Sequence, residues 1–194
     1  RRQMRRPKIK IAPPAPERLE WMSPPRWSRD NPRGTTIIFL DVDGVLNRTT
    51  KKNVQLEGAL LDRLARVALV AESHIVLSSV WRLHGDLRAR VARALSERRL
   101  VLVGQTRDLR PEKLAPGDCW EALRVREIRD WLKRHGGRVS RWAVVDDLPL
   151  DVKGGLEPQR FVRTDERAGL SETNARELIR RLGVAAVAAD VAFP

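Results

Sequence analysis

Short apolar segments alternate with segments of helical periodicity between residues 35 and 183. Apolar runs of four or five residues, rich in β-branched side chains, are typical of strands buried on both faces of a sheet. Strands that alternate with helices predict right-handed βαβ units and a parallel sheet. We therefore expect a Rossmann-like three-layer α/β/α sandwich with a mainly parallel sheet. The expected strands are 36–40, 74–77, 100–103, 142–145 and a shorter fifth segment, 160–162.

Leucine, isoleucine and valine recur at helical spacing between these strands. The expected helices contain residues 60–67, 87–95 and 128–132, the last of these ending at Gly136-Gly137, and a final helix capped by Ser171 and closed by Gly183. In open parallel sheets, ligands bind at the carboxyl ends of the strands. The residues that directly follow each strand are therefore the candidate site residues.

Carboxylates and hydroxyls follow three of the expected strands. Because these strand ends meet at one edge of the sheet, several carboxylates would converge there, and such a concentration of negative charge favours a bound cation. Mg²⁺ fits best, since it prefers carboxylate and carbonyl oxygens and often holds a substrate phosphate as well. The residues in question are Asp41, Asp43 and Gly44 after the first strand, Ser78, Ser79 and Arg82 after the second, and Asp146, Asp147 and Asp151 after the fourth.

This set of groups is suited to phosphoryl transfer. A carboxylate such as Asp41 can attack phosphorus and form an aspartyl-phosphate. A second carboxyl two residues further on, Asp43, can protonate the leaving oxygen and then activate water. A metal ion and a basic side chain offset the charge on the transferred group.

Three segments together resemble the haloacid dehalogenase (HAD) superfamily of phosphohydrolases: Phe39-Leu40-Asp41-Val42-Asp43-Gly44-Val45-Leu46-Asn47, Val76-Leu77-Ser78-Ser79-Val80-Trp81-Arg82 and Val144-Val145-Asp146-Asp147. The ending Ser79-Val80-Trp81-Arg82 and the late Gly169-Leu170 are most similar to the small HAD domains of Swiss-army-knife RNA-repair proteins. The resemblance spans about residues 35 to 183.

The resemblance implies a role for each motif residue. Asp41 would be the nucleophile, Asp43 the general acid/base, and Ser78 a phosphate ligand, with Gly44 and Ser79 beside the substrate. The expected Mg²⁺ ligands are Asp41 and Asp43, together with Asp147 and Asp151 on or near the metal side of the site. Asp146 is the alternative to Asp147 as a metal ligand. The basic catalytic residue would be Arg124, with Arg126 as the alternative. Arg82 could contact phosphate or form a structural salt bridge.

Many members of this superfamily carry a cap domain over the site. Here the connection after Asn47 has about ten residues, and the one between the third strand and the helix around Trp131 has about twenty, which is too few for a folded cap. We therefore expect an open, capless site, which favours a phosphate at the end of RNA or DNA, with nucleotides close behind. The alternative is a catalytically silent HAD-fold module for nucleic-acid binding or assembly.

The charge is concentrated near the N-terminus. The formal net charge is +13, and residues 1–33 account for +7 of it, with ten Lys/Arg and three Asp/Glu. This proline-rich segment is expected to be an extended or disordered arm in front of one HAD-like domain over 34–194. Its basic residues favour polyanionic partners, although a generically basic surface would give the same excess. Trp21 and Trp27 could stack on bases or pin the arm onto the domain.

The sequence contains no predicted membrane span or signal peptide, and it has one cysteine. No stretch approaches the roughly 18 apolar residues of a membrane span, and the basic N-terminus lacks the apolar segment of a signal peptide. The single cysteine, Cys119, has no partner for an internal disulfide and fits a reducing compartment. A cytoplasmic location is therefore expected.

Removal of residues 1–33 tests the role of the arm. The shortened protein should retain turnover of small phosphomonoesters but bind nucleic acid more weakly, with a shallower dependence of affinity on salt, because fewer counterions are released. Affinity of both forms for an oligonucleotide, measured across a salt series, checks this. Equal affinity and equal salt slopes would contradict it.

Overall fold

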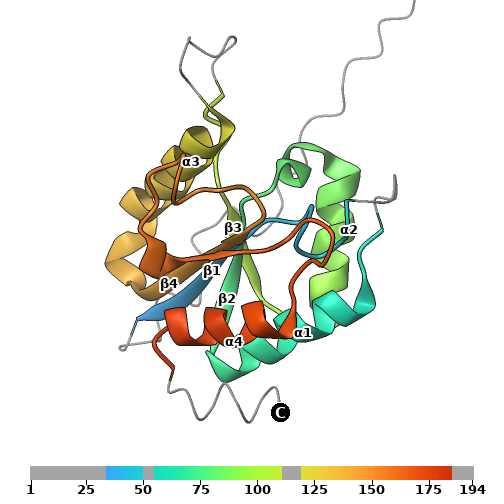
Figure 1. Ribbon diagram of the computed structural model, residues 1–194. Helices are drawn as coiled ribbons and strands as arrows, with labels where there is room; N and C mark the ends of the chain where they lie inside the picture. Colours follow the sequence, from blue (N-terminus) through green and yellow to red (C-terminus); the bar gives the residue numbers. More distant parts are fainter. Residues whose placement is uncertain (1–33, 50–54, 111–118, 185–194) are drawn as a thin grey trace, which may run out of the picture.

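A five-stranded parallel sheet forms the centre of the molecule, seen in the computed structural model, which describes residues 34–49, 55–110 and 119–184 (Figure 1). The strand order is β3-β2-β1-β4-β5, and every neighbouring pair is parallel. This confirms the predicted Rossmann-like α/β fold. The strands are β1 (Thr35–Leu40), β2 (Ser73–Leu77), β3 (Leu102–Gln105), β4 (Val139–Asp146) and β5 (Phe161–Arg163).

Helices cover both faces of the sheet, with α3 on the opposite side of the strands from α1 and α2 (Figure 1). Among the described residues, the α-helices are α1 (Gly58–Val70), α2 (Gly85–Ser96), α3 (Trp120–His135) and α4 (Glu172–Arg181). Three short 3₁₀ turns connect other elements: η3 (Val80–Leu83), η4 (Gly136–Arg138) and η5 (Pro158–Arg160).

Alternate residues of β1 supply the two cores. All six residues of the strand are buried, as the unbroken apolar pattern predicts for a central strand. Ile38 and Leu40 belong to the core under α1 and α4, whereas Ile37 and Phe39 belong to the core under α3. Phe39 meets Trp131 of α3 edge to face, with ring centroids 5.3 Å apart. The strand that carries the candidate nucleophile is therefore packed on both faces.

The third strand lies two residues further along the chain than predicted, at 102–105 rather than 100–103. The backbone N–H of Leu100 donates to the carbonyl of Leu95 at 3.0 Å, so Leu100 closes the end of α2 instead of starting a strand. The fifth strand is displaced by one residue, to 161–163. These shifts leave the order and type of the elements as predicted.

The expected N-terminal arm, residues 1–33, lies outside the described residues. Within the part of the chain that is described, none of the helices combines the length and the apolar character needed to cross a membrane.

Gly169 is a position where the fold demands glycine. Its φ is +67°, in the left-handed region, and a Cβ there would lie 2.6 Å from Leu60 Cδ1. Gly155 has a nearly equal φ of +69°, but a Cβ there would meet nothing within 4 Å. A side chain at Gly155 would therefore cause backbone strain alone, whereas a side chain at Gly169 would cause backbone strain and a steric clash with Leu60.

We expect Gly169→Ala to lower the free energy of unfolding by about 1–2 kcal/mol for the left-handed backbone and by about 1–3 kcal/mol more for overpacking. Gly155→Ala should show the first contribution only, and Gly137→Ala, with open space and no positive φ, should be close to neutral. Urea unfolding of the three variants checks this. Equal losses at Gly169 and Gly155 would show that the contact with Leu60 is not tight.

Candidate active site

Strand β1 occupies the point where the strand order reverses, because β2 pairs with it on one side and β4 on the other. Leu40 is in register with Val145, and the Asp41 N–H donates to the Val145 carbonyl at 3.1 Å. Asp41 and Asp146 therefore follow neighbouring positions at the carboxyl edge of the sheet. In open α/β sheets, the crevice at such a switch point is the usual ligand site.

Arg124 of α3 joins these two strand ends. Its Nη1 lies 2.9 Å from Asp41 Oδ1 and 2.6 Å from Asp146 Oδ2, and all three side chains are buried. Burial by itself lowers the pKa of Arg124, but the carboxylates of Asp146 and Asp41 outweigh this and hold the pKa above its usual value. Arg126, the alternative candidate, is exposed. The structure thus brings Arg124 to the candidate nucleophile.

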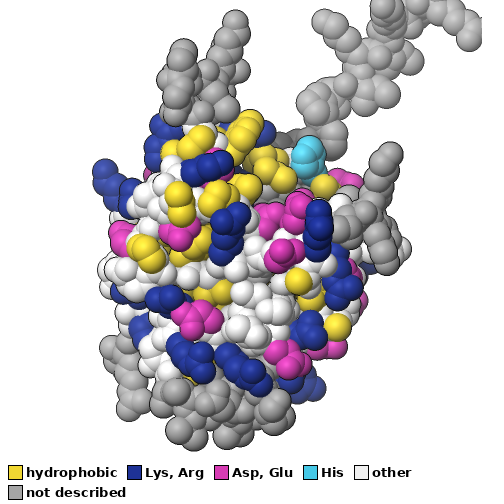
Figure 2. Space-filling view, in the orientation of Figure 1, with side chains coloured by type: hydrophobic (Ala, Val, Ile, Leu, Met, Phe, Trp, Pro, Cys, Tyr) yellow, Lys and Arg dark blue, Asp and Glu magenta, His cyan; other side chains and the backbone are white. Residues whose placement is uncertain are grey.

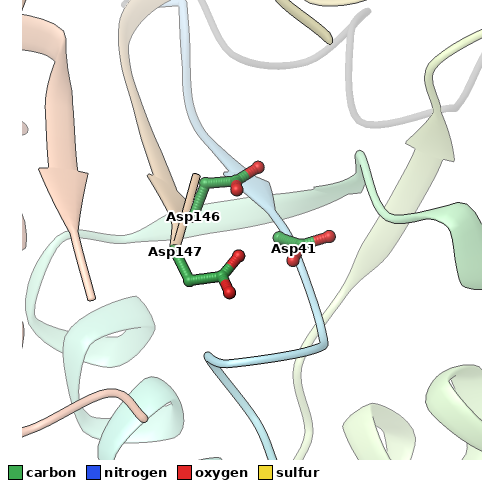
Figure 3. A group of neighbouring side chains, drawn as sticks. All are labelled: Asp41, Asp146 and Asp147. Atoms are coloured by element: carbon green, nitrogen blue, oxygen red, sulfur yellow. The ribbon is translucent and has the colours of Figure 1, made fainter. Parts of the chain in front are cut away.

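Three carboxylates face a common space at this edge: those of Asp41, Asp146 and Asp147 (Figure 3). One oxygen from each can be chosen so that all lie within 4.8 Å of one another. Burial raises the pKa of Asp146 to about 8 and, with the nearby Asp41 charge, that of Asp147 to about 6. Burial also raises the pKa of Asp41, opposed by the charge of Arg124 and a hydrogen bond from Ser79. Ionisation of these three carboxyl groups is therefore unfavourable unless a cation binds between them.

Gly44 allows the first loop to approach Asp147. It has a φ of +69°, and a Cβ at this position would lie only 2.6 Å from Asp147 Oδ2. The Gly44 N–H donates to Asn47 Oδ1 at 3.1 Å, and its carbonyl accepts from Thr164 Oγ1 at 2.8 Å. The turn is therefore held from both sides, and a larger residue would displace Asp147.

Asp43 is not part of the three-carboxylate group. Its Oδ2 accepts a hydrogen bond from the indole Nε1 of Trp81, and its Oδ1 accepts one from the Asn47 amide, both at 2.8 Å. These donors hold the carboxylate in one orientation. We did not predict roles for Trp81 or Asn47 from the sequence, although both lie inside the motif segments. The indole of Trp81 is a buried donor that needs an acceptor, which is the signal that could have indicated it.

The two serines after β2 occupy different positions. The Ser79 hydroxyl donates a hydrogen bond to the Asp41 carboxylate and accepts one from the backbone N–H of Trp81 at 3.4 Å. Ser78 is fully buried, and its hydroxyl has no hydrogen-bond partner within the described part of the chain. An unpartnered buried hydroxyl is costly unless a ligand satisfies it, so Ser78 is suited to a phosphate oxygen.

Arg82 is engaged within the protein. Its guanidinium donates to the carbonyls of Ser79, Thr106 and Arg107, and Nη2 lies 2.7 Å from Glu127 Oε2. This arrangement matches the structural salt bridge that was one of its two expected roles.

Asp151 lies in the turn after β4, outside the three-carboxylate group, and its Oδ1 is buried without a hydrogen-bond partner among the described residues. The expected metal ligands Asp43 and Asp151 are therefore near the cluster in sequence, but their side chains are not within it.

The donor set fits a hard divalent cation. All three members of the cluster offer carboxylate oxygens, and no nitrogen or sulfur ligand that would favour zinc is among them. With only three such side chains, positions remain for water and a phosphate oxygen, as Mg²⁺ sites usually have.

The family comparison agrees with this geometry. The family model described as the HAD domain in Swiss Army Knife RNA repair proteins matches residues 37–175. No curated protein and no solved structure gives a significant match. The matched range begins within β1, contains all of the candidate site residues and extends into α4. The chain therefore belongs to the family of HAD domains found in Swiss Army Knife RNA repair proteins.

Proposed function

We propose that the protein is a Mg²⁺-dependent phosphatase that transfers the phosphoryl group of a phosphomonoester to Asp41 and then to water. The observation that carries this proposal is the buried bridge from Arg124 to both Asp41 and Asp146, beside the partly buried Asp147. The family to which the chain belongs supports phosphohydrolase chemistry. A catalytically silent module would have no need of a nucleophile, an acid/base and a basic residue in one place.

In the first step, Asp41 Oδ attacks phosphorus, the bond to the leaving oxygen breaks, and an aspartyl-phosphate forms. Arg124 balances the negative charge of the transferred group, and its charge lowers the pKa of Asp41 against the larger opposite effect of burial. Ser78 supplies a hydroxyl to a phosphate oxygen. Asp41, Asp146 and Asp147 are the residues that would hold Mg²⁺, whose charge would offset that of the phosphate.

Asp43 acts first as the general acid for the leaving group and then as the general base for the attacking water. Its protonated carboxyl gives a proton to the departing oxygen, and the resulting carboxylate takes one from the water that attacks the aspartyl-phosphate. Trp81 and Asn47 hold it by hydrogen bonds during both steps. The second step releases inorganic phosphate and restores both carboxyl groups to their starting states.

The substrate class follows from the family and the charge. The family model is named for RNA repair proteins, and the net charge of +13 favours polyanionic substrates. We propose phosphorylated RNA or DNA ends as substrates, with nucleotides as smaller substrates of the same chemistry.

Asp41→Asn tests the chemical proposal. Because amide nitrogen and oxygen cannot replace the attacking carboxylate, kcat/KM for phosphomonoesters should fall by about 10³-fold or more. Phosphate release with Mg²⁺ over nucleotides, sugar phosphates and 3′- or 5′-phosphorylated oligonucleotides measures this.

Asp86→Asn is the matched control, since Asp86 is an exposed aspartate in the first turn of α2. Its activity should equal that of the parent protein. If no substrate turns over in the parent, or if Asp41→Asn is as active as the parent, the phosphatase proposal is wrong.

The raised pKa values predict how Mg²⁺ affects stability. Asp146 and Asp147 have pKa values of about 8 and about 6 in the folded protein, above the ordinary 3.8, so the folded state binds more protons than the unfolded chain between these limits. Their contribution to stability is complete below about pH 4 and is lost as the pH rises through the folded values. Mg²⁺ replaces the lost protons, so the rise in Tm that it causes should be larger near about pH 8 than near about pH 5.5.

Thermal unfolding with and without MgCl₂, at matched ionic strength, measures this increment. Asp147→Asn should reduce the increment at the higher pH, because it removes a ligand. An increment that does not change with pH, or one that is equal in Asp147→Asn, would contradict the assignment of the cation to this cluster.

A further inference from the structure

A small apolar pocket adjoins the candidate active site and shares Arg124 with it. Its volume is about 170 Å³, and its walls come from η3, from α3, from Arg110 after β3 and from Leu148 after β4. Typical sites for whole small molecules have about 300–1,000 Å³. The pocket is therefore large enough for one ring system of a substrate and too small for an entire nucleotide.

The pocket has an exposed aromatic wall. Trp120, the first residue of α3, is 54% exposed although its side chain is an indole, and Val80 opposite is 43% exposed. Leu123 and Leu148 contribute further apolar surface. Figure 2 shows apolar side chains gathered over this end of α3, with Lys and Arg side chains among them. An exposed indole beside apolar walls is the kind of surface on which a nucleobase stacks.

The same face of α3 serves the pocket and the chemistry. Trp120 and Arg124 are four residues apart, so they lie one above the other on the helix, and Glu127 follows on that face. Glu127 is paired with Arg82, so the carboxylate in the pocket wall is neutralised. The other two arginines of the lining are ion-paired as well, Arg110 with Asp108 and Arg124 with Asp41 and Asp146, so the pocket suits an uncharged ring rather than a second anion.

We propose that this pocket binds the nucleobase next to the phosphate being removed, stacked on Trp120, and that the enzyme thereby prefers phosphorylated nucleosides and nucleic-acid ends to sugar phosphates without a base. This inference rests on the proposed phosphatase function, because it places the phosphate at Asp41. The connection is Arg124, which touches Asp41 and also lines the pocket. A base held there would bring its own phosphate to the strand ends.

The test compares nucleoside 5′- and 3′-monophosphates with the corresponding ribose phosphates in the full chain. The parent should have a higher kcat/KM for the nucleotides. Trp120→Ala should reduce this preference about tenfold, the scale of one base–aromatic stack, mainly through KM, and Trp120→Phe should retain most of it. The control is Leu69→Ala, an exposed apolar residue of α1 outside the pocket, which should leave the preference unchanged.

The outcomes separate the pocket from the chemistry. If the parent turns over both substrate classes equally, or Trp120→Ala keeps the parental preference, the base-binding pocket is wrong while the phosphatase proposal stands. If neither class turns over, the phosphatase proposal is wrong. Calorimetric binding of adenosine monophosphate and ribose 5-phosphate to the parent and Trp120→Ala then decides the pocket, since stacking requires tighter nucleotide binding that depends on Trp120.

Discussion

The buried guanidinium of Arg124 is the interaction on which the site depends. Asp41 and Asp146 are removed from solvent, and two carboxylates in that position would be strongly unfavourable without a compensating positive charge. Arg124 supplies this charge at 2.9 and 2.6 Å and, in doing so, ties α3 to the ends of β1 and β4. Removing one member of such a buried group leaves the others unpaired, so the bridge also has a structural role beside the catalytic one that we propose for it.

A second buried pair supports the first. Glu127, three residues after Arg124 on α3, holds Arg82, and Arg82 in turn donates to the backbone of the loops after β2 and β3. The desolvation of Glu127 raises its pKa, and the charge of Arg82 opposes that effect. Through these two pairs, α3 is attached to the carboxyl ends of four strands, β1, β2, β3 and β4. The position of the catalytic groups therefore follows from one helix as much as from the sheet.

The fold and the strand-end residues could be predicted from the sequence because both depend on local patterns. Unbroken apolar runs identify β1, β2 and β4, and the residues after a strand must lie at the sheet edge whatever the rest of the chain does. Arg124 was preferred over Arg126 because of the family resemblance, and the structure places it between Asp41 and Asp146. The third strand was predicted to begin at Leu100, two residues too early. Leu100 instead closes the end of α2, and an apolar residue in either role looks the same in the sequence.

What the sequence could not indicate are the contacts between distant elements. The hydrogen bond from Trp81 to Asp43 and the ion pair between Arg82 and Glu127 join residues 38 and 45 positions apart, and no local period marks them. A role for Trp120 was not predicted for a related reason. The apolar period that indicates α3 in the sequence comes from core residues such as Ile128 and Trp131, whereas Trp120 is exposed. One face of α3 carries Trp120, Arg124 and Glu127. These residues have helical spacing, but one is aromatic, one basic and one acidic, so an apolar pattern does not mark them and only the packed structure shows that they line one pocket.

That mixed face supports the proposal that substrate selectivity comes from the pocket beside Arg124. The groups proposed to bind the phosphate, which are Ser78, Arg124 and a cation held by the aspartates, would contact only the part that every phosphomonoester carries. Selectivity therefore has to come from groups that contact the remainder of the substrate. Here those groups and the catalytic arginine project from the same side of one helix. Any substrate positioned by the pocket is thus positioned relative to Asp41 as well, because α3 is anchored to Asp41 through Arg124. In this proposal, the ion pairs that fix α3 at the strand ends link substrate recognition to the chemical step.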